Sequence, residues 1–388
     1  MKIDLRLIFQ YDEYVLKSIE KALGDDILNI LFSLTKPPNR LYLRVNLLKT
    51  SREEVLELIE KDGYKAYEDE DLEEAIYIPV EGPYRLKQRG KIVIADKKAS
   101  ESVMMGSNLY SPGVISCDNV REGDEVSIVS ENGILVAVGR TMISCANAIK
   151  TRSGVFVKVE ESLYRAAPVR ELTAWLQGLI YPQSFPSMIA SRMLFPGSSD
   201  VIVDMCAAPG GKAGHIFELS MGKAEVYAID HSARRIDEML ENFKRLGYGD
   251  KIKIYRLDSR YLSRDLGIKA DKVIIDPPCT ATGVKPKLWH RILYRDLENL
   301  VKYQVQFLTE AQRILKDGGI LVYSTCSITY DENEMLIGEL IENKGFEVIE
   351  PPYWVKRRTV VTDYGAIRFD PRFGYPGFFI VSLRKKKA

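Results

Sequence analysis

The chain contains the stretch Val201-Ile202-Val203-Asp204-Met205-Cys206-Ala207-Ala208-Pro209-Gly210-Gly211-Lys212, in which an apolar strand enters a glycine-rich turn. A helical pattern follows near 213–220. Further strands and helices then alternate: strands at 224–230, 252–255, 272–276 and 319–323, and amphipathic helices near 232–246 and 296–316. Repeated strand–helix–strand units with apolar strands predict a parallel sheet that helices cover on both faces. The predicted fold class is therefore α/β, with a Rossmann-like doubly wound sheet.

Polar residues stand where these strands end, and ligands of open α/β sheets bind at that edge. Gly210 and Gly211 follow the first strand, and their lack of a Cβ lets backbone approach a ligand closely. Asp230 ends the second strand, where a carboxylate can reach ribose hydroxyls, and Asp258 follows the third. The turn has neither the Walker A spacing nor the G-x-G-x-x-G spacing. The pattern favours S-adenosyl-L-methionine, a nucleoside cofactor without a phosphate anchor, over a glycine turn that only closes a sheet.

Two cysteines follow the next two strands. The fourth strand ends in Asp276-Pro277-Pro278-Cys279 and the fifth in Ser324-Thr325-Cys326-Ser327. The C5 atom of a pyrimidine is a poor nucleophile until a thiolate adds at C6, and a second group must later remove the C5 proton. A nearby positive charge lowers the pKa of such a thiol, and Lys212 is a candidate source. Either cysteine alone is more often a packed thiol. Their placement at neighbouring strand ends favours chemistry.

These motifs resemble motifs I, IV and VI of the Sun-domain RNA cytosine-5 methyltransferases. Arg44-Val45-Asn46 resembles the N-terminal RNA-recognition-like segment of that family, Tyr181-Pro182-Gln183-Ser184 the stretch leading into its core, and Gly377-Phe378-Phe379-Ile380 its closing strand. In one departure, Thr280-Ala281-Thr282-Gly283 follows the motif IV cysteine, where the family usually has Ser-Gly. This difference puts the geometry of that loop in question, but not the identity of the cysteine.

The resemblance implies roles for the residues at these motifs. Cys326 is implied as the nucleophile and Cys279 as the residue that releases the product, while Asp276 holds the N3/N4 edge of the cytosine and Lys212 supports the catalytic loop. The implied cofactor-binding residues are Cys206, Ala207, Ala208, Pro209, Gly210, Gly211, Lys212, Asp230, Arg235, Asp258 and Asp276.

Two smaller units precede the catalytic part. Residues 1–91 contain a strand at 41–46, a helix after Thr50 and a strand at 75–79, a pattern that predicts a small α+β segment. Residues 92–166 hold short apolar runs separated by turn signals, which predict a compact β-barrel or sandwich. The predicted division is therefore 1–91, 92–166 and a methyltransferase domain at 167–388.

The inserted unit narrows the expected substrate. Gly106-Ser107-Asn108-Leu109-Tyr110-Ser111-Pro112-Gly113-Val114 resembles the RNA-facing loop of a PUA domain. Within the Sun-domain family, a PUA domain at this place implies the branch that methylates cytosine 72 of the tRNA acceptor stem and binds the 3′ CCA end. The alternative is a barrel that serves only as a spacer. The candidate RNA contacts are Lys97, Lys98, Tyr110, Lys150 and Arg152. A cytosine in a stem must be unpaired and extruded before a thiol reaches it.

Composition sets outer limits on the function. The 388 residues are 46% hydrophobic and 28% charged with a net charge of +1, which excludes a polycationic nucleic-acid coat. The N-terminus shows no signal-peptide pattern, and no apolar run is long enough to span a membrane. Five widely spaced cysteines predict free thiols in a reducing cytoplasm, and three scattered histidines without a C-x-x-C pair predict no metal site. We expect a cytoplasmic monomer.

Three other functions compete with this hypothesis. An adenine amino-methyltransferase would have an aromatic residue in the place of Cys279. In a cytosine-5 DNA methyltransferase Cys279 would be the nucleophile, and the PUA-like insert would have no role. A non-catalytic RNA-binding or assembly factor would need a degenerate cofactor site, and none of the three motifs suggests one. Within the family, another tRNA or rRNA position remains open as the target.

Overall fold

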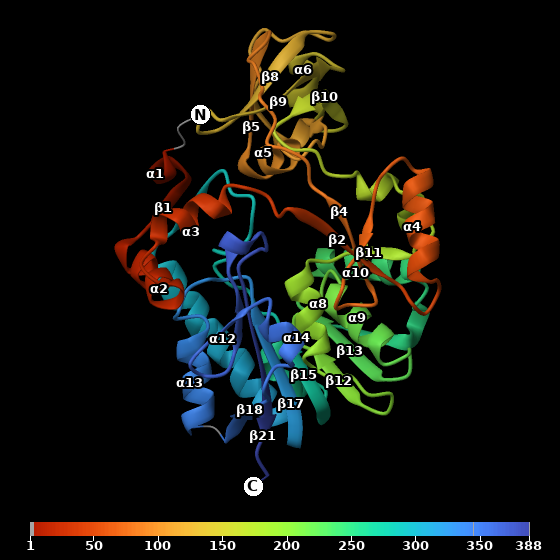
Figure 1. Ribbon diagram of the computed structural model, residues 1–388, viewed down its shortest axis with the longest axis vertical. Coiled ribbons are helices and arrows are strands. Elements are labelled where there is room, and N and C mark those ends of the chain that lie inside the picture. Colours follow the sequence, from red (N-terminus) through yellow and green to blue (C-terminus); the bar gives the residue numbers. More distant parts are fainter. Residues whose placement is uncertain (1–3, 344, 388) are drawn as a thin grey trace.

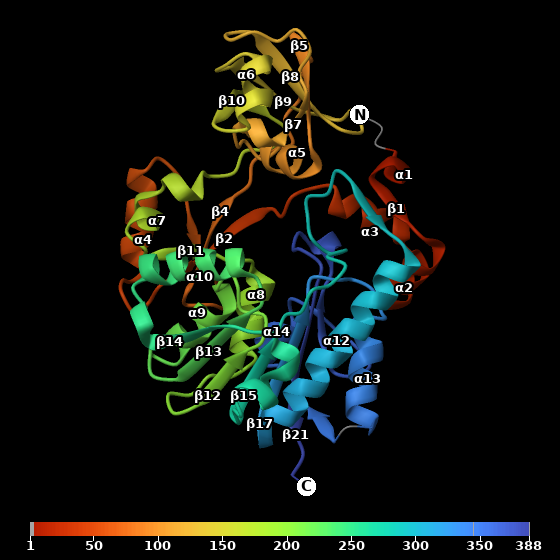
Figure 2. The same ribbon diagram turned by 180° about the vertical axis from the view of Figure 1, so that it is seen from behind.

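The computed structural model describes residues 4–343 and 345–387 of the chain, and Figures 1 and 2 show it from opposite sides. Its largest element is a nine-stranded sheet with the order β14-β13-β12-β15-β17-β21-β20-β19, in which β18 also pairs with β21. The strands are β12 (Val201–Asp204), β13 (Glu225–Asp230), β14 (Ile252–Arg256), β15 (Ala270–Ile275), β17 (Leu315–Thr325), β18 (Phe346–Val348), β19 (Val360–Val361), β20 (Ile367–Phe369) and β21 (Phe378–Lys385). The chain order reverses between β12 and β15, which is the switch point where ligands of such sheets bind.

Helices cover both faces of this sheet, as the sequence predicts. Alternate residues of each strand point to opposite faces, so that Ile202 and Val322 pack in one apolar cluster and Val203 and Leu321 in another. The first face carries α8 (Phe185–Arg192), α9 (Gly211–Leu219) and α10 (Ala233–Leu246), and the second carries α11 (Leu262–Asp265), α12 (Tyr294–Ile314) and α13 (Glu334–Asn343). The predicted Rossmann-like, doubly wound core is confirmed.

The sheet is not parallel throughout. The five strands from β14 to β17 are parallel, but β21 pairs antiparallel with β17, and β20 and β18 pair antiparallel with β21. Neighbouring parallel strands need a long crossover connection, usually a helix, whereas antiparallel strands can be joined by a short turn. The prediction of a parallel sheet is therefore correct for the five strands from β14 to β17, whose carboxyl ends form the predicted cofactor site.

A four-stranded sheet with the order β11-β2-β4-β3 forms the N-terminal α+β segment. It contains β2 (Arg40–Val45), β3 (Tyr67–Glu68), β4 (Ala75–Pro79) and β11 (Ile180–Pro182), with α4 (Arg52–Lys61) and α7 (Thr173–Leu176) beside it. Because β11 lies just before the catalytic core in sequence and pairs with β2, the sheet ties the two parts together. The Arg44 guanidinium, at the end of this sheet, forms a buried ion pair with Glu218 of α9, 2.8 Å away.

Residues 5–34 form a mainly helical unit that the sequence pattern does not indicate. It comprises α1 (Leu5–Ile8), β1 (Phe9–Tyr11), α2 (Glu13–Leu23) and α3 (Ile27–Leu34). Its apolar residues pack against Leu297 of α12 and Ile328, and β1 pairs in parallel with β16 (His290–Ile292). This unit therefore rests on the catalytic part, next to the segment that follows Cys279.

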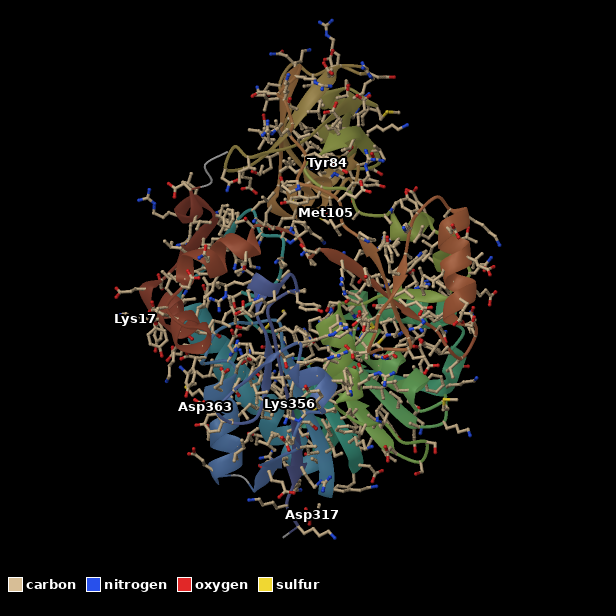
Figure 3. All side chains as sticks on the ribbon, viewed as in Figure 1. Lys17, Tyr84, Met105, Asp317, Lys356 and Asp363 are labelled. Atoms are coloured by element: carbon tan, nitrogen blue, oxygen red, sulfur yellow. A yellow bond between two sulfur atoms is a disulfide. The ribbon has the colours of Figure 1, made fainter. Side chains whose placement is uncertain are left out.

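A six-stranded sheet with the order β6-β10-β9-β8-β5-β7 forms the separate body at the top of Figure 1. It contains β5 (Lys91–Ala95), α5 (Lys97–Val103), β6 (Leu109–Tyr110), η1 (Ser111–Gly113), β7 (Val114–Ser116), β8 (Glu125–Ser130), β9 (Leu135–Thr141), α6 (Cys145–Thr151) and β10 (Val155–Ser162). The segments that lead into and out of this body are hydrogen-bonded to each other: Glu81 and Arg165 exchange backbone hydrogen bonds of 3.0 and 2.9 Å. Tyr84 and Met105, labelled in Figure 3, lie in this junction.

One expectation about the cysteines is wrong. Cys117 and Cys145 form a disulfide, so that only Cys206, Cys279 and Cys326 are free thiols. The two partners are 28 residues apart in sequence, but β7 ends near the start of α6, and this brings their Cα atoms to 5.6 Å. Widely spaced cysteines thus meet when irregular turns fold back, and spacing alone does not reveal that.

Candidate active site

A cavity of about 270 Å³ lies at the carboxyl ends of the parallel strands. It runs from the carboxylates of Asp230 and Asp258 to the thiols of Cys279 and Cys326. Its lining residues are Met205, Cys206, Asp230, His231, Arg235, Leu257, Asp258, Ser259, Asp276, Pro277, Pro278, Cys279, Ala281, Tyr303, Phe307 and Cys326. The structure therefore places the predicted cofactor carboxylates and both predicted catalytic cysteines on one cavity wall.

The sulfurs of Cys279 and Cys326 lie 3.3 Å apart. This separation exceeds the ~2.05 Å of a disulfide bond and suits a thiol–thiolate contact. The contact with Cys326, together with burial, raises the pKa of the Cys279 thiol well above its usual value. The Cys279 thiol is therefore harder to deprotonate than an isolated cysteine would be, and it keeps its proton at neutral pH.

Lys212, in the first turn of α9, pairs with the carboxylate of Asp276. Burial opposes its charge, but Asp276, Asp204 and Cys326 together raise the pKa of Lys212 above its ordinary value. Asp204 lies beneath this group at the end of β12, where burial raises its pKa to about 7. The structure therefore places the Lys212 ammonium close enough to Cys326 to interact with it electrostatically.

The other end of the cavity suits a nucleoside. Asp230 pairs with Arg235 at 3.2 Å, and the same guanidinium donates to the carbonyl of Ala208 in the glycine-rich turn. Arg260 holds Asp258 through bonds of 2.6–3.1 Å and lowers the pKa of that carboxyl. The buried Ser259 hydroxyl has no hydrogen-bond partner among residues 4–343 and 345–387. Ordered carboxylates beside a free hydroxyl fit the ribose and base of S-adenosyl-L-methionine.

The remaining residues of the glycine-rich turn lie beside this cavity rather than in it. Ala207, Ala208, Pro209, Gly211 and Lys212 line a second cavity of about 270 Å³, which shares Cys206, Arg235 and Asp276 with the first.

Gly210 lines neither cavity. It has a φ of +100°, and a Cβ there would come within 2.6 Å of the Phe243 ring. The need for glycine at this position therefore comes from its backbone conformation and from close packing of α10.

Glu332 is a site residue that sequence patterns miss. This fully buried carboxylate accepts hydrogen bonds from the Thr280 backbone N–H at 2.8 Å and from the Thr280 and Ser327 hydroxyls at 2.5 Å. Thr280 directly follows Cys279, and Ser327 directly follows Cys326. One carboxylate thus binds both cysteine loops, and this explains how the two sulfurs are held together.

The unusual Thr280-Ala281-Thr282-Gly283 sequence is accommodated without loss of these contacts. The Thr280 and Thr282 hydroxyls each lie 3.0 Å from the Ser327 oxygen, and Ala281 takes a left-handed φ of +53°. The backbone N–H of Gly283 donates to the Cys326 carbonyl at 2.9 Å. The threonine at 280 therefore supplies the hydroxyl that a serine would supply, and the loop keeps Cys279 at the cavity wall.

Lys287 is a second residue that the sequence analysis does not single out. Its side chain is only 2% exposed, and its ammonium donates to the Ala281 carbonyl at 2.7 Å. Burial and the charge of Lys97, opposed by Cys326, Glu101 and Cys279, together lower the pKa of Lys287 to about 8. A second cation therefore lies close enough to Cys326 and Cys279 to interact with both electrostatically.

The predicted RNA contacts divide into two groups. Lys98 and Tyr110 line a cavity of about 730 Å³ between the six-stranded body and residues 167–171, together with Asn108 and Arg170. Lys97, Lys150 and Arg152 lie outside this lining. The Lys97 ammonium stands 5.9 Å from the Trp289 ring, and Arg152 donates to the Val114 carbonyl at 2.8 Å.

No helix in the described part of the chain is long and apolar enough to cross a membrane. The described residues likewise contain no group of three or more His, Cys, Asp or Glu side chains arranged to hold a metal ion.

The doubly wound sheet and the cavity at its switch point define a nucleoside-cofactor transferase. Three families match successive parts of the chain: the RsmF/B-like ferredoxin-like domain at residues 11–85, the PUA domain at 90–163, and 16S rRNA methyltransferase RsmB/F at 191–384. The chain belongs to the RsmB/F methyltransferase family, with an N-terminal ferredoxin-like domain and a PUA domain. Methyltransferases of this family use S-adenosyl-L-methionine. The resemblance to Sun-domain methyltransferases and the predicted fold class are confirmed.

Two relatives and one solved structure span most of the chain. A tRNA (cytosine(72)-C(5))-methyltransferase of Pyrococcus horikoshii is 40% identical over 92% of both chains. The tRNA (cytosine(72)-C(5))-methyltransferase NSUN6 of Mus musculus is 26% identical over 85% of this chain and 77% of its own length. The crystal structure of NSun6 from Pyrococcus horikoshii with SFG, an S-adenosylmethionine analogue, is 38% identical with a TM-score of 0.90, and the match covers 97% of this chain and 99% of that one.

Proposed function

We propose that this protein transfers a methyl group from S-adenosyl-L-methionine to C5 of cytosine 72 in the acceptor stem of tRNA. The observation that carries the chemistry is the pair of thiols, 3.3 Å apart, on the wall of a cavity that also presents Asp230 and Asp258. A packed thiol pair would need no carboxylate-lined cavity beside it. The Pyrococcus relative, which matches nearly end to end, supports the choice of position 72.

In this proposal Cys326 attacks. Its thiolate, stabilised by the Lys212 ammonium, forms a bond to C6, and the C5=C6 electron pair then makes C5 nucleophilic. Asp276, which pairs with Lys212, would hold the N3/N4 edge of the base. S-adenosyl-L-methionine, held by Asp230, Asp258 and their neighbours, supplies the electrophilic methyl group.

Cys279 then releases the product. While Cys326 is a thiolate, its charge is one of the causes that keep the pKa of Cys279 high. Once Cys326 is bonded to carbon, that charge is gone, and Cys279 releases its proton to solvent more easily. The Cys279 thiolate accepts the C5 proton, the electron pair restores the C5=C6 bond, and the Cys326–C6 bond breaks to return the thiolate.

The substrate end of the proposal rests on the PUA domain. The cavity of about 730 Å³ with Lys98, Tyr110 and Arg170 would take the 3′ CCA end. It shares Pro182 with the cavity that holds Lys212 and Asp276, so that a strand can pass from one to the other. Residues 92–166 would thus bind RNA and residues 167–388 catalyse, while 1–91 would join them. Since one chain carries every element of this site, we propose a monomer that acts on tRNA in the cytoplasm.

Bisulfite sequencing of tRNA incubated with the protein and S-adenosyl-L-methionine tests the proposal. Protection of cytosine 72 from conversion is expected, and a Cys326→Ala variant should show none. Methylation of an rRNA or of an anticodon stem, with position 72 unchanged, would overturn the substrate assignment while leaving the chemistry in place.

A further inference from the structure

A further cavity, of about 200 Å³, lies between the start of β2 and the loop that precedes β21. Figure 1 shows the segment between α3 and β2 crossing the molecule below the PUA domain, and one wall of the cavity comes from this segment. Its lining residues are Pro38, Asn39, Arg40, Tyr42, Ser184, Phe185, Phe373, Gly374, Tyr375 and Pro376. The cofactor and cysteine chemistry uses none of them.

The accessible aromatic rings make this cavity suitable for stacking. Phe373 is 69% exposed, which leaves one of the largest apolar side chains of the molecule in contact with solvent. The half-buried Tyr375 ring is held in place by Phe185 and Phe369, each with its ring centre 5.4 Å away. A ring whose position is already set loses little entropy when a planar group stacks on it. Bases stack on such rings irrespective of their identity.

The polar groups of the cavity favour an anion. None of its lining residues is acidic. Arg40 forms no ion pair with any residue in the described ranges: its guanidinium stacks on Tyr77 at 4.2 Å and donates to the Tyr42 hydroxyl at 3.2 Å. Nearby Asp69 is already bound by Arg358 at 2.9 Å. The Asn39 amide, with no hydrogen-bond partner in those same ranges, adds a free donor and acceptor.

The cavity also borders the chemical site. It shares Ser184 with the cavity lined by Lys212 and Asp276, which in turn shares Pro182 with the PUA-side cavity. Three cavities thus follow one another, and the middle one shares Cys206, Arg235 and Asp276 with the cavity that Cys279 and Cys326 line. An RNA whose 3′ end lies in the cavity lined by Lys98 and Tyr110 would present further nucleotides to the cavity lined by Phe373 and Tyr375.

We propose that this cavity binds one unstacked nucleotide of the substrate RNA other than the target cytosine. The base stacks on Phe373 and Tyr375, Asn39 contacts its edge, and Arg40 pairs with a phosphate. Extruding the target from the stem breaks its stacking, and a site that holds a displaced neighbour offsets that cost. This inference rests on the proposed function, because it takes the substrate to be an RNA opened next to the target.

The test combines a protein variant with abasic substitutions in the RNA. Phe373→Ala is made in the full chain, with Tyr353→Ala as matched control, because Tyr353 is 82% exposed and lies outside the cavity. The Kd for tRNA and kcat/KM are measured with intact tRNA and with tRNAs that carry one abasic nucleotide at successive positions around cytosine 72. We expect Phe373→Ala to lower kcat/KM about tenfold with intact tRNA, the size of a stacking contact of about 1.4 kcal/mol.

One abasic position should then cost the wild type about tenfold and cost Phe373→Ala nothing further, since both changes remove the same contact. Arg40→Gln should lower the slope of log Kd against log salt by about one, as for one lost phosphate contact. Equal kcat/KM and Kd for Phe373→Ala and Tyr353→Ala would overturn the inference, as would additive losses at every abasic position. Failure of the proposed function is seen separately, as wild-type protein that leaves cytosine 72 unmethylated, and the Kd comparison still decides the cavity in that case.

Discussion

Cys117 and Cys145 are joined by a disulfide in the PUA domain, whereas Cys279 and Cys326 are free thiols 3.3 Å apart at the edge of the catalytic sheet. The bonded pair lies in an apolar cluster with Val120 and Ala148. The free pair borders a cavity and faces two ammonium groups, Lys212 and Lys287.

The comparison shows that a short distance between two sulfurs does not by itself determine the role of the two cysteines. In the PUA domain the pair joins the end of β7 to the start of α6 and packs among apolar side chains. At the catalytic edge the Glu332 carboxylate holds the two loops by accepting hydrogen bonds from the Thr280 backbone N–H and the Ser327 hydroxyl, and the cations stabilise negative charge. The first pair is predicted to support stability and the second to support reactivity.

The largest expected effect comes from removing the proposed nucleophile. Cys326→Ala should lower methyl transfer on the order of 10⁴-fold or more, because no other group can form the bond to C6. Transfer of labelled methyl groups to tRNA measures this, and circular dichroism shows whether the fold persists. Activity near the wild-type level would assign the attack to another residue.

Cys279→Ala should separate methyl transfer from release. Without a base for the C5 proton the Cys326–C6 bond persists, so that a covalent protein–RNA adduct accumulates and turnover falls about 10³-fold. Denaturing gel electrophoresis with labelled tRNA detects the adduct. The double variant Cys279→Ala/Cys326→Ala is the control and should form none; an adduct in it would show that Cys326 is not the attached residue.

Glu332→Gln tests whether one carboxylate holds the free pair together. The amide can accept fewer hydrogen bonds than the carboxylate, so the Thr280 and Ser327 loops should loosen and kcat should fall about 10²-fold with little change in KM. Steady-state kinetics with tRNA measures both constants. Glu334→Gln is a suitable comparison, because the Glu334 carboxylate accepts its hydrogen bonds from Arg368 rather than from Thr280 or Ser327. An equal fall in both variants would indicate general destabilisation.

Sequence patterns predict that Cys279 and Cys326 lie together, but they do not predict the residues that surround this pair, Glu332 and Lys287. Parallel strands end at one edge, so residues that follow β15 and β17 must be neighbours, and this alone brings Cys279 and Cys326 together. Glu332 is reached only after the chain turns back beyond Cys326, and Lys287 only through a loop of irregular backbone. Neither position follows from strand periodicity, because the direction of a side chain in a loop depends on its three-dimensional contacts.

The same limit applies to the N-terminal unit and to the disulfide. Ile8, Val15 and Ile19 pack in one cluster with Ile292, Leu297 and Ile328 of the catalytic part, and not with the α+β sheet that follows them in sequence. Cys117 and Cys145 are 28 residues apart in sequence, and the strands β8 and β9 lie between them. In both cases the partner lies far away in sequence, and local hydrophobic patterns carry no record of it.

Lys287 gives the free pair a dependence on pH. Its folded-state pKa is about 8, below the usual value, so its positive charge is present below pH 8 and is lost as the pH rises through that value. The groups that face it are Cys326, Cys279, Glu101 and Lys97. We expect kcat/KM of the wild type to fall above about pH 8, where the Cys326 thiolate loses this cation.

Lys287→Met should lower kcat/KM about tenfold at pH 7.5 and should lose this alkaline limb; tenfold is the effect of about one pKa unit of electrostatic support. Lys285→Met is the matched control: its pKa is also lowered to about 8, but its ammonium donates to the Pro371 carbonyl, and no cysteine influences it. Full kcat/KM–pH profiles from pH 6 to 9.5 provide the measurement. An alkaline limb that persists in Lys287→Met and disappears in Lys285→Met would contradict the assignment.

The bonded pair should affect stability without affecting chemistry. Cys117→Ser/Cys145→Ser removes a cross-link between residues 28 apart, which should lower the free energy of unfolding of the PUA domain by about 3 kcal/mol. Urea unfolding followed by hydrogen exchange in β8 and β9 measures this loss, and reductant should produce a similar loss in the wild type but none in the variant.

Single-turnover methyl transfer at saturating tRNA should be unchanged, because the catalytic thiols keep their neighbours. Alkylation of the denatured, unreduced protein should label three of its five cysteines; labelling of all five would show that the pair is not bonded, and the two cysteine pairs would then differ only in their surroundings.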